Sequence, residues 1–153
     1  MTAPLFASAA EGPDTGARNP GLLPRLFAVF MALHGLVHVV GFTVPWGLGG
    51  PRGVEYTTRI LNQSIEVGDA GARLLGFVWL AAAAGILIAA VMIWRGHRWA
   101  LRSTVAVVVG SLALCAIGFP NARFGLIIDI VLVGLLAFAS EKLVGRTASR
   151  AVR

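Results

Sequence analysis

The chain has 153 residues, of which 57% are hydrophobic and only 13% are charged, and its formal net charge is +6. A soluble domain carries about 25% charged residues, so this composition excludes an ordinary water-facing surface. Because so small a body cannot bury all of its apolar residues, lipid must be the solvent for much of its surface. The arginines that supply most of the positive charge flank apolar runs, which favours anionic lipid headgroups over nucleic acid as a partner.

The two ends of the chain differ from its middle. Residues 1–24 include Glu11, Pro13 and Asp14 and lack the basic start and adjacent apolar core of a secretory signal. Their composition predicts a disordered cytoplasmic tail. At the other end, residues 144–153 carry three arginines and are predicted to form a basic cytoplasmic tail.

Four long apolar stretches lie between these tails, within residues 25–143. They cover Leu26–Val44, Leu74–Trp94, Ser103–Phe119 and Phe124–Ser140. Each is close to the roughly 17 to 25 residues that a membrane-spanning helix needs. With mostly short connections between them, they predict an all-α fold: an integral membrane, antiparallel four-helix bundle.

The first connection, residues 45–73, is long. Its first part, Pro45–Gly53, is too rich in glycine and proline for a helix and predicts a loop. The following stretch, Val54–Val67, has apolar residues scattered among polar ones and predicts a short helix on the outer membrane surface.

The positions of arginine and lysine predict the orientation, because basic connections are retained on the cytoplasmic side. With both termini in the cytoplasm, nine basic residues lie on that side and four on the other. The nine are Arg18, Arg25, Arg95, Arg98, Arg102, Lys142, Arg146, Arg150 and Arg153, and the four are Arg52, Arg59, Arg73 and Arg123. The bias predicts a multi-pass protein of the inner membrane with residues 45–73 in the periplasm.

Small residues at intervals of four predict how the helices pack, because close approach of two backbones needs such residues. They are Ala28 and Ala32 in the first span, Ala81, Gly85 and Ala89 in the second, Ser111 and Cys115 in the third, and Gly125 in the fourth. Cys115 is the only cysteine, which excludes an intrachain disulfide and a thiolate zinc cluster.

The first span contains His34 and His38, which are four residues apart and therefore lie on one face of its helix. His38 lies six residues from the outer end of this span at Val44, and Asp129 lies five residues into the fourth span from the same surface. At a rise of about 1.5 Å per residue, both groups lie roughly 8 to 9 Å deep. The three side chains are therefore expected to meet.

Further polar residues lead into the second and fourth spans at the same surface. With the buried residues they predict a polar pocket in the outer half of the bundle, lined by His34, His38, Asp129, Asp69, Arg73, Asn121 and Arg123. Asp69 and Asn121 also stand where helix caps would stand. Arg73 can pair with Asp69, and Arg123 can reach lipid headgroups.

Ionisable groups inside a membrane span are costly and usually face a partner or a water-filled cavity. His34, His38 and Asp129 therefore have three interpretations. They can form interhelical hydrogen bonds that fix the bundle, or relay protons. They can also bind a transition metal such as zinc or iron, with Asp69 or Glu66 completing the nitrogen and oxygen ligands.

The segment His34–Phe42, HGLVHVVGF, resembles the HGxxHxxGF first-span motif of a widespread, uncharacterised family of small bacterial four-span membrane proteins. The likeness continues through Gly76–Ala82 and Asn121–Gly125 and covers nearly the whole membrane part. In that family the position of Asp129 can be asparagine, so the resemblance makes the two histidines more dependable metal ligands than Asp129. The four-span layout is also similar to that of DoxX-like proteins, a likeness of architecture alone.

Three classes of function fit these features. The preferred one is a membrane protein of binding or accessory type, with its polar pocket reachable from the periplasm. The second is a membrane-embedded, metal-dependent oxidoreductase or hydrolase, in which Asp129 or Glu66 moves protons. The third is transport of a small solute or of protons, which would require a homo-oligomer, and Ala81, Gly85 and Ala89 could supply the contact between copies.

Overall fold

The structure, a computed structural model, describes the backbone of residues 21–151 and the side chains of residues 21–137. In that part the elements are α1 (Leu22–His38), α2 (Val40–Thr43), β1 (Arg59–Ile60), β2 (Ile65–Glu66), α3 (Gly68–Trp94), α4 (Ala100–Ile117) and α5 (Arg123–Ala151). The protein is mostly helical, as its sequence predicts, with a small two-stranded sheet between α2 and α3.

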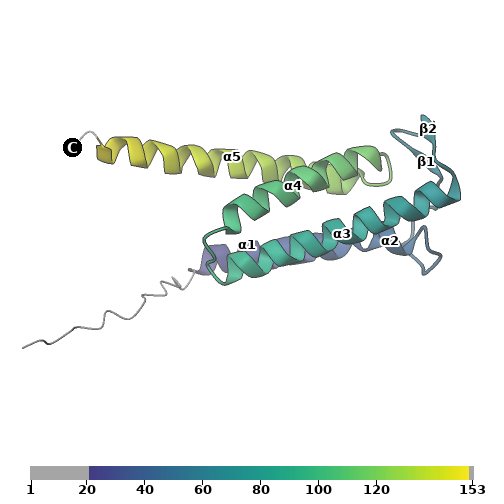
Figure 1. Cartoon of the computed structure of the whole chain (residues 1–153), viewed down its shortest axis with the longest axis horizontal. Helices are drawn as coiled ribbons and strands as arrows, with labels where there is room; N and C mark the ends of the chain where they lie inside the picture. Colours follow the sequence, from purple (N-terminus) through teal and green to yellow (C-terminus); the bar gives the residue numbers. More distant parts are fainter. Residues whose placement is uncertain (1–20, 152–153) are drawn as a thin grey trace, which may run out of the picture.

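The long helices of the described part pack around one apolar core. α3 contacts α1, α2 and α4, and α4 contacts α5. Short turns join α3 to α4 and α4 to α5, which run antiparallel, while α1 lies alongside α3 (Figure 1). Each long helix contributes a large, fully buried side chain to the core: Met31 of α1, Ile86 of α3, Val108 of α4 and Leu132 of α5.

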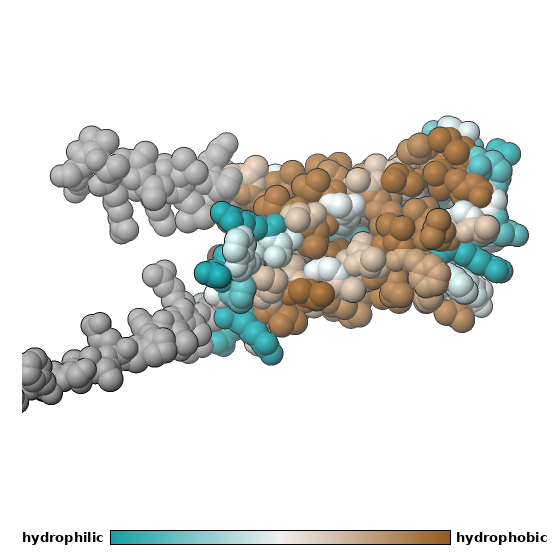
Figure 2. All heavy atoms as spheres, in the orientation of Figure 1, coloured by the Kyte–Doolittle hydropathy of each residue, from teal (hydrophilic) through white to brown (hydrophobic). Residues whose placement is uncertain are grey.

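The outer surface of the bundle is apolar. Within the described residues, three helices are long and apolar enough to cross a membrane: the segment Leu22–Thr43, α3 and α4. Figure 2 shows apolar surface along the body of the molecule, with hydrophilic residues gathered at its two ends. Large apolar side chains point outward from every long helix, among them Leu33, Val37, Leu74, Ile88, Val105, Val109, Ile127 and Leu135. This distribution suits a lipid environment and identifies the chain as a membrane protein.

The first helix starts earlier than its apolar stretch predicts. α1 begins at Leu22, so residues 22–24 belong to the helix and not to the predicted tail. Pro24 lies in the first turn, where a missing backbone N–H costs nothing because it has no intrahelical partner. The rest of the predicted tail, residues 1–20, lies outside the described residues.

The other helices also extend beyond the predicted spans. α3 begins at Gly68, six residues before its apolar stretch. The first turns of this helix contain Asp69 and Arg73, so an uncharged apolar run does not include them. α5 continues to Ala151, into the predicted basic tail over residues 144–153.

The predicted surface helix over Val54–Val67 is wrong. β1 and β2 form an antiparallel hairpin in which Arg59 lies opposite Glu66, and Nε of Arg59 lies 3.0 Å from a Glu66 carboxylate oxygen. The connecting residues Leu61, Asn62 and Gln63 have φ angles of 49°, 55° and 65°. Three successive left-handed residues cannot continue a right-handed helix, so the chain turns back here.

The hairpin is fastened to one end of the helical bundle, which we call the hairpin end. The N–H of Leu61 donates to the carbonyl of Ile117 at 2.9 Å, and the N–H of Asn62 donates to the carbonyl of Phe119 at 3.0 Å. Carbonyl groups at and beyond the end of a helix lack intrahelical partners, so these bonds satisfy both segments. Residues 51–62, which we call the roof loop, therefore lie across the hairpin end.

Two of the three small residues of α3 pack inside the chain. Ala89 is fully buried. A Cβ atom added at Gly85 would lie 3.2 Å from a methyl group of Val107, so this position packs against α4. Ala81, by contrast, is exposed. A contact between copies through this stripe stays a prediction.

Candidate functional site

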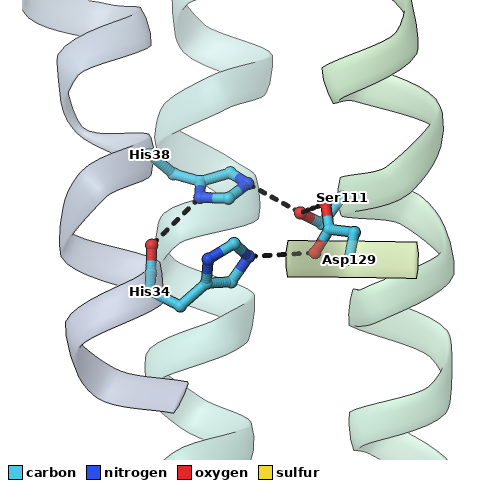
Figure 3. Close-up of polar contacts among 4 residues, drawn as sticks. All are labelled: His34, His38, Ser111 and Asp129. Carbon is cyan, nitrogen blue, oxygen red and sulfur yellow. Dashed lines mark hydrogen bonds and ion pairs between the residues drawn. The ribbon is translucent and has the colours of Figure 1, made fainter. Parts of the chain in front are cut away.

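α1 and α5 bring three ionisable side chains together in the interior of the bundle. His34, His38 and Asp129 are 4%, 2% and 0% exposed. The two imidazoles lie on one face of α1 with ring centroids 4.7 Å apart, and Asp129 points toward them from α5 (Figure 3). The three side chains therefore meet, as the depths calculated from the helix rise predict, although 95 residues separate His34 from Asp129.

Ser111 of α4 completes a continuous hydrogen-bond network with these three residues. Nε2 of His34 lies 2.9 Å from one Asp129 oxygen, and the Ser111 hydroxyl lies 2.6 Å from the other. Nε2 of His38 lies 2.7 Å from the same hydroxyl, and Nδ1 of His38 lies 3.1 Å from the carbonyl oxygen of His34 (Figure 3). We call these four residues the buried network.

The hydrogen bonds of the buried network require one proton in addition to that of the Ser111 hydroxyl, and this proton can lie on His38 or on Asp129. The His34 carbonyl can only accept, so Nδ1 of His38 must carry a proton. The single proton of the Ser111 hydroxyl can fill only one of its two contacts, with His38 or with Asp129. The other contact needs a proton on Nε2 of His38 or on the Asp129 carboxyl. Either way, with His34 neutral, the charges within the network cancel, which lowers the cost of its burial.

The spacing of Ser111 and Cys115 predicts a packing role for Ser111, whereas in the structure its hydroxyl makes two polar contacts. Serine is common in membrane helices and gives no distinctive signal by its type. Its depth does give a signal, because Ser111 lies six residues before the end of α4 at Ile117. At about 1.5 Å per residue it lies about 9 Å deep, at the level of His38 and Asp129.

A cavity of about 250 Å³ lies between the buried network and the roof loop, and we call it the outer cavity. Its lining is mostly apolar and includes Val40, Leu75, Trp79, Val54 and Ile60. His38 also lines it, and the Trp79 ring centroid lies 5.2 Å from that of His38. The cavity therefore joins the roof loop to one member of the buried network.

The predicted pocket residues are divided among several places. His38 and Asn121 line the outer cavity, and Asn121 donates its side-chain N–H to the carbonyl of Glu55 at 3.2 Å. His34 and Asp129 belong to the buried network behind His38. The guanidinium of Arg123 lies 5.1 Å from the Phe124 ring centroid, outside the described hollows.

Asp69 and Arg73 line a second, more open hollow of about 360 Å³ on the other side of Tyr56 and Val44. Asp69 is not a helix cap, since α3 begins after Val67 without a side-chain cap. It instead accepts a hydrogen bond of 2.6 Å from Tyr56, and this bond raises the pKa of the Tyr56 hydroxyl. Arg73 lies 5.8 Å from the Trp46 ring centroid.

Glu66 is committed to the hairpin. Its carboxylate pairs with Arg59 and accepts the N–H of Gly68 at 3.2 Å. A hydrogen bond from Thr58, together with those from Gly68 and Arg59, lowers the pKa of Glu66. Asp69 is bound to Tyr56. Neither carboxylate therefore lies with the histidines, and the prediction that Asp69 or Glu66 completes a set of metal ligands is wrong.

Among the described residues, the donor atoms of His34, His38 and Asp129 lie within 4.8 Å of one another, and all three residues are buried. Two imidazoles and a carboxylate have the chemistry of a transition-metal site, of a proton relay or of a structural network. Comparison of the chain with models of known protein families, with curated proteins and with solved structures finds no match.

Proposed function

We propose that this chain is a four-span protein of the bacterial inner membrane that binds a small, largely apolar ligand in its outer cavity. Both termini lie in the cytoplasm, and the roof loop lies on the periplasmic side. α5 supplies the fourth span. The observation that carries the proposal is the outer cavity itself, which is half-open and is lined by helix ends and by the roof loop at the level of His38.

The exposed surface of α5 supports the proposal that this helix is the fourth membrane span. Phe124, Ile127, Ile130, Val131 and Leu135 of this helix are exposed, whereas Leu132 packs in the core with the other three long helices. A helix with one side in a shared core and large apolar side chains on its other side is stable when lipid covers that side. The nine-to-four distribution of basic residues supports the orientation.

The size and chemistry of the outer cavity indicate the ligand class. Pockets for drug-sized ligands have volumes of about 300 to 1,000 Å³, so a cavity of about 250 Å³ suits a smaller molecule. Both ring nitrogens of His38 already have partners in the buried network. A ligand that formed a hydrogen bond with Nε2 of His38 would have to displace Ser111, whereas an apolar ligand gains from leaving water or lipid headgroups without that cost.

The orientation predicts which introduced cysteines react from the periplasm. In a Cys115→Ala background, Thr57→Cys in the roof loop should react with a membrane-impermeant maleimide in spheroplasts. His97→Cys, in the turn between α3 and α4, should react only after the membrane is permeabilised. The measurement is the mass shift of the labelled chain. Equal labelling of both variants in sealed spheroplasts would contradict the orientation.

Filling the outer cavity should block its ligand. A lipid-soluble aryl diazirine, activated by light, should label peptides that contain the cavity-lining residues Trp79 and Cys115. Ala122→Phe places a phenyl ring at a position that lines the cavity. Because overfilling costs about 1 to 3 kcal/mol, we expect this variant to weaken the probe's apparent affinity by roughly tenfold or more.

Ala106→Phe is the matched control for this labelling experiment. Ala106 is exposed on α4 and lines neither described hollow, so the same change in volume should leave the labelling of the two peptides unchanged. Mass spectrometry of digested protein in lipid nanodiscs measures both variants. If Ala122→Phe and Ala106→Phe label alike, the outer cavity does not bind the probe and the proposed function fails.

A further inference from the structure

We propose that His34, His38 and Asp129 bind one divalent transition-metal ion, of the zinc or ferrous class, beside the outer cavity. The ligand atoms are Nε2 of each histidine and a carboxylate oxygen of Asp129. This site is separate from the proposed apolar ligand, because the outer cavity can bind such a ligand whether or not a metal is present.

The donor atoms have the right chemistry and nearly the right spacing. Two imidazoles and one carboxylate form the ligand set of many zinc and ferrous sites that keep open positions for water or substrate. Two ligand atoms at about 2.0 to 2.2 Å from one ion lie about 3.3 to 3.6 Å apart in tetrahedral geometry. One ligand atom from each of the three residues lies within 4.8 Å of the other two, so the most distant pair must approach by roughly an ångström to hold an ion.

The contacts of each residue already orient its donor atom. Metal-binding histidines usually donate the other ring N–H to a carbonyl or carboxylate. Nδ1 of His38 makes such a bond with the carbonyl of His34, which directs Nε2 into the cluster. The separation of 2.9 Å between Nε2 of His34 and Asp129 is that of two neighbouring ligands on an octahedral ion, and for a tetrahedral ion it must widen by roughly half an ångström.

The charge of the bound state indicates what completes the coordination. A divalent ion with two neutral imidazoles and the Asp129 carboxylate has a net charge of +1 in an apolar interior, where an uncompensated charge is costly. An anionic ligand in an open position removes this charge. His38 lines the outer cavity, so that side of the cluster is where hydroxide or an anionic group of a small molecule would bind.

Two conservative variants separate a metal site from a purely structural network. Asp129→Asn keeps the shape of the side chain and can still accept from His34 and donate to Ser111, but a neutral amide is a poor ligand for a transition metal. Ser111→Ala removes a hydrogen-bond partner and leaves all three proposed ligands. If the cluster is a metal site, Asp129→Asn should do more damage than Ser111→Ala. If the cluster is a purely structural network, Ser111→Ala should do more damage.

The test is a titration of chelator-treated protein in nanodiscs with Co²⁺, whose visible d–d absorption reports coordination by protein ligands. We expect about one Co²⁺ per chain in wild type and in His97→Ala, the control outside the site. Asp129→Asn and His38→Ala should lose more than about a hundredfold in affinity, because even an outer partner of a metal ligand contributes 10-fold to 100-fold. Ser111→Ala should still bind one ion, with a loss within that smaller range.

Wild-type binding below about half an equivalent, or affinity that Asp129→Asn and His38→Ala leave unchanged, would overturn the metal site. Circular dichroism and gel filtration of each variant separate a lost ligand from a lost fold, and His38→Gln replaces His38→Ala if the latter unfolds. Diazirine labelling of the same metal-free protein tests the outer cavity separately. Failure of Co²⁺ binding with normal labelling therefore rejects the metal site alone.

Discussion

Asp129→Ala is expected to lower the free energy of unfolding by about 1 to 3 kcal/mol relative to Asp129→Asn, because it leaves buried donors without an acceptor. The Asp129 carboxyl group is hydrogen-bonded to both His34 and Ser111. Alanine can accept from neither, whereas asparagine keeps an oxygen for His34. Reversible unfolding in mixed micelles, followed by tryptophan fluorescence, measures the difference.

The size of this effect distinguishes the buried network from ordinary polar contacts between membrane helices. Such contacts contribute about 0.6 kcal/mol on average, because the unfolded chain in the membrane also finds partners. Asp129 is fully buried and joins α5 to two other helices, so its loss should exceed that average. A difference between alanine and asparagine below this value would show that the network contributes no special stability.

Gly41→Ala should destabilise the bundle by about 1 to 3 kcal/mol, which is the usual cost of forcing extra atoms into a packed site. A Cβ atom at Gly41 would collide with Trp79, including the first atom of its side chain, which cannot move without α3. Because Trp79 also lines the outer cavity and lies against His38, diazirine labelling should change as well.

Gly110→Ala is the matched control for Gly41→Ala. Gly110 is exposed in α4, and an added Cβ atom would meet nothing within 4 Å. Alanine favours helix over glycine by up to about 1 kcal/mol, so this variant should be as stable as wild type or more stable. Equal destabilisation by the two variants would mean that contact with Trp79 is not the cause. The same unfolding measurement serves both.

The helices and the meeting of His34, His38 and Asp129 could be predicted because they depend on regular geometry. Long apolar runs locate helices, and a fixed rise per residue converts sequence position into depth. The helix starts at Leu22 and Gly68 could not be located in this way, since polar turns extend a helix without adding apolar residues.

The roof loop could not be predicted, because long-range contacts determine it. Leu61, Asn62 and Gln63 have no glycine or proline among them, yet all three adopt left-handed backbone conformations. Leu61 and Asn62 donate backbone hydrogen bonds to Ile117, the last residue of α4, and to Phe119 just beyond it, far away in the sequence. A local pattern contains no information about such a partner. Of the seven residues predicted to line a polar pocket, His38 and Asn121 line the outer cavity, and its largely apolar lining, part of which this loop supplies, could not be predicted.

The attachment of Leu61 and Asn62 to α4 also limits what side-chain substitution can do there. Both bonds run from main-chain N–H groups to main-chain oxygens, so they need no polar side chain at either position. Proline has no N–H to donate, and β-branched residues resist the left-handed backbone that both positions adopt. Substitutions of Leu61 or Asn62 should therefore act on this attachment through the backbone conformations that they favour.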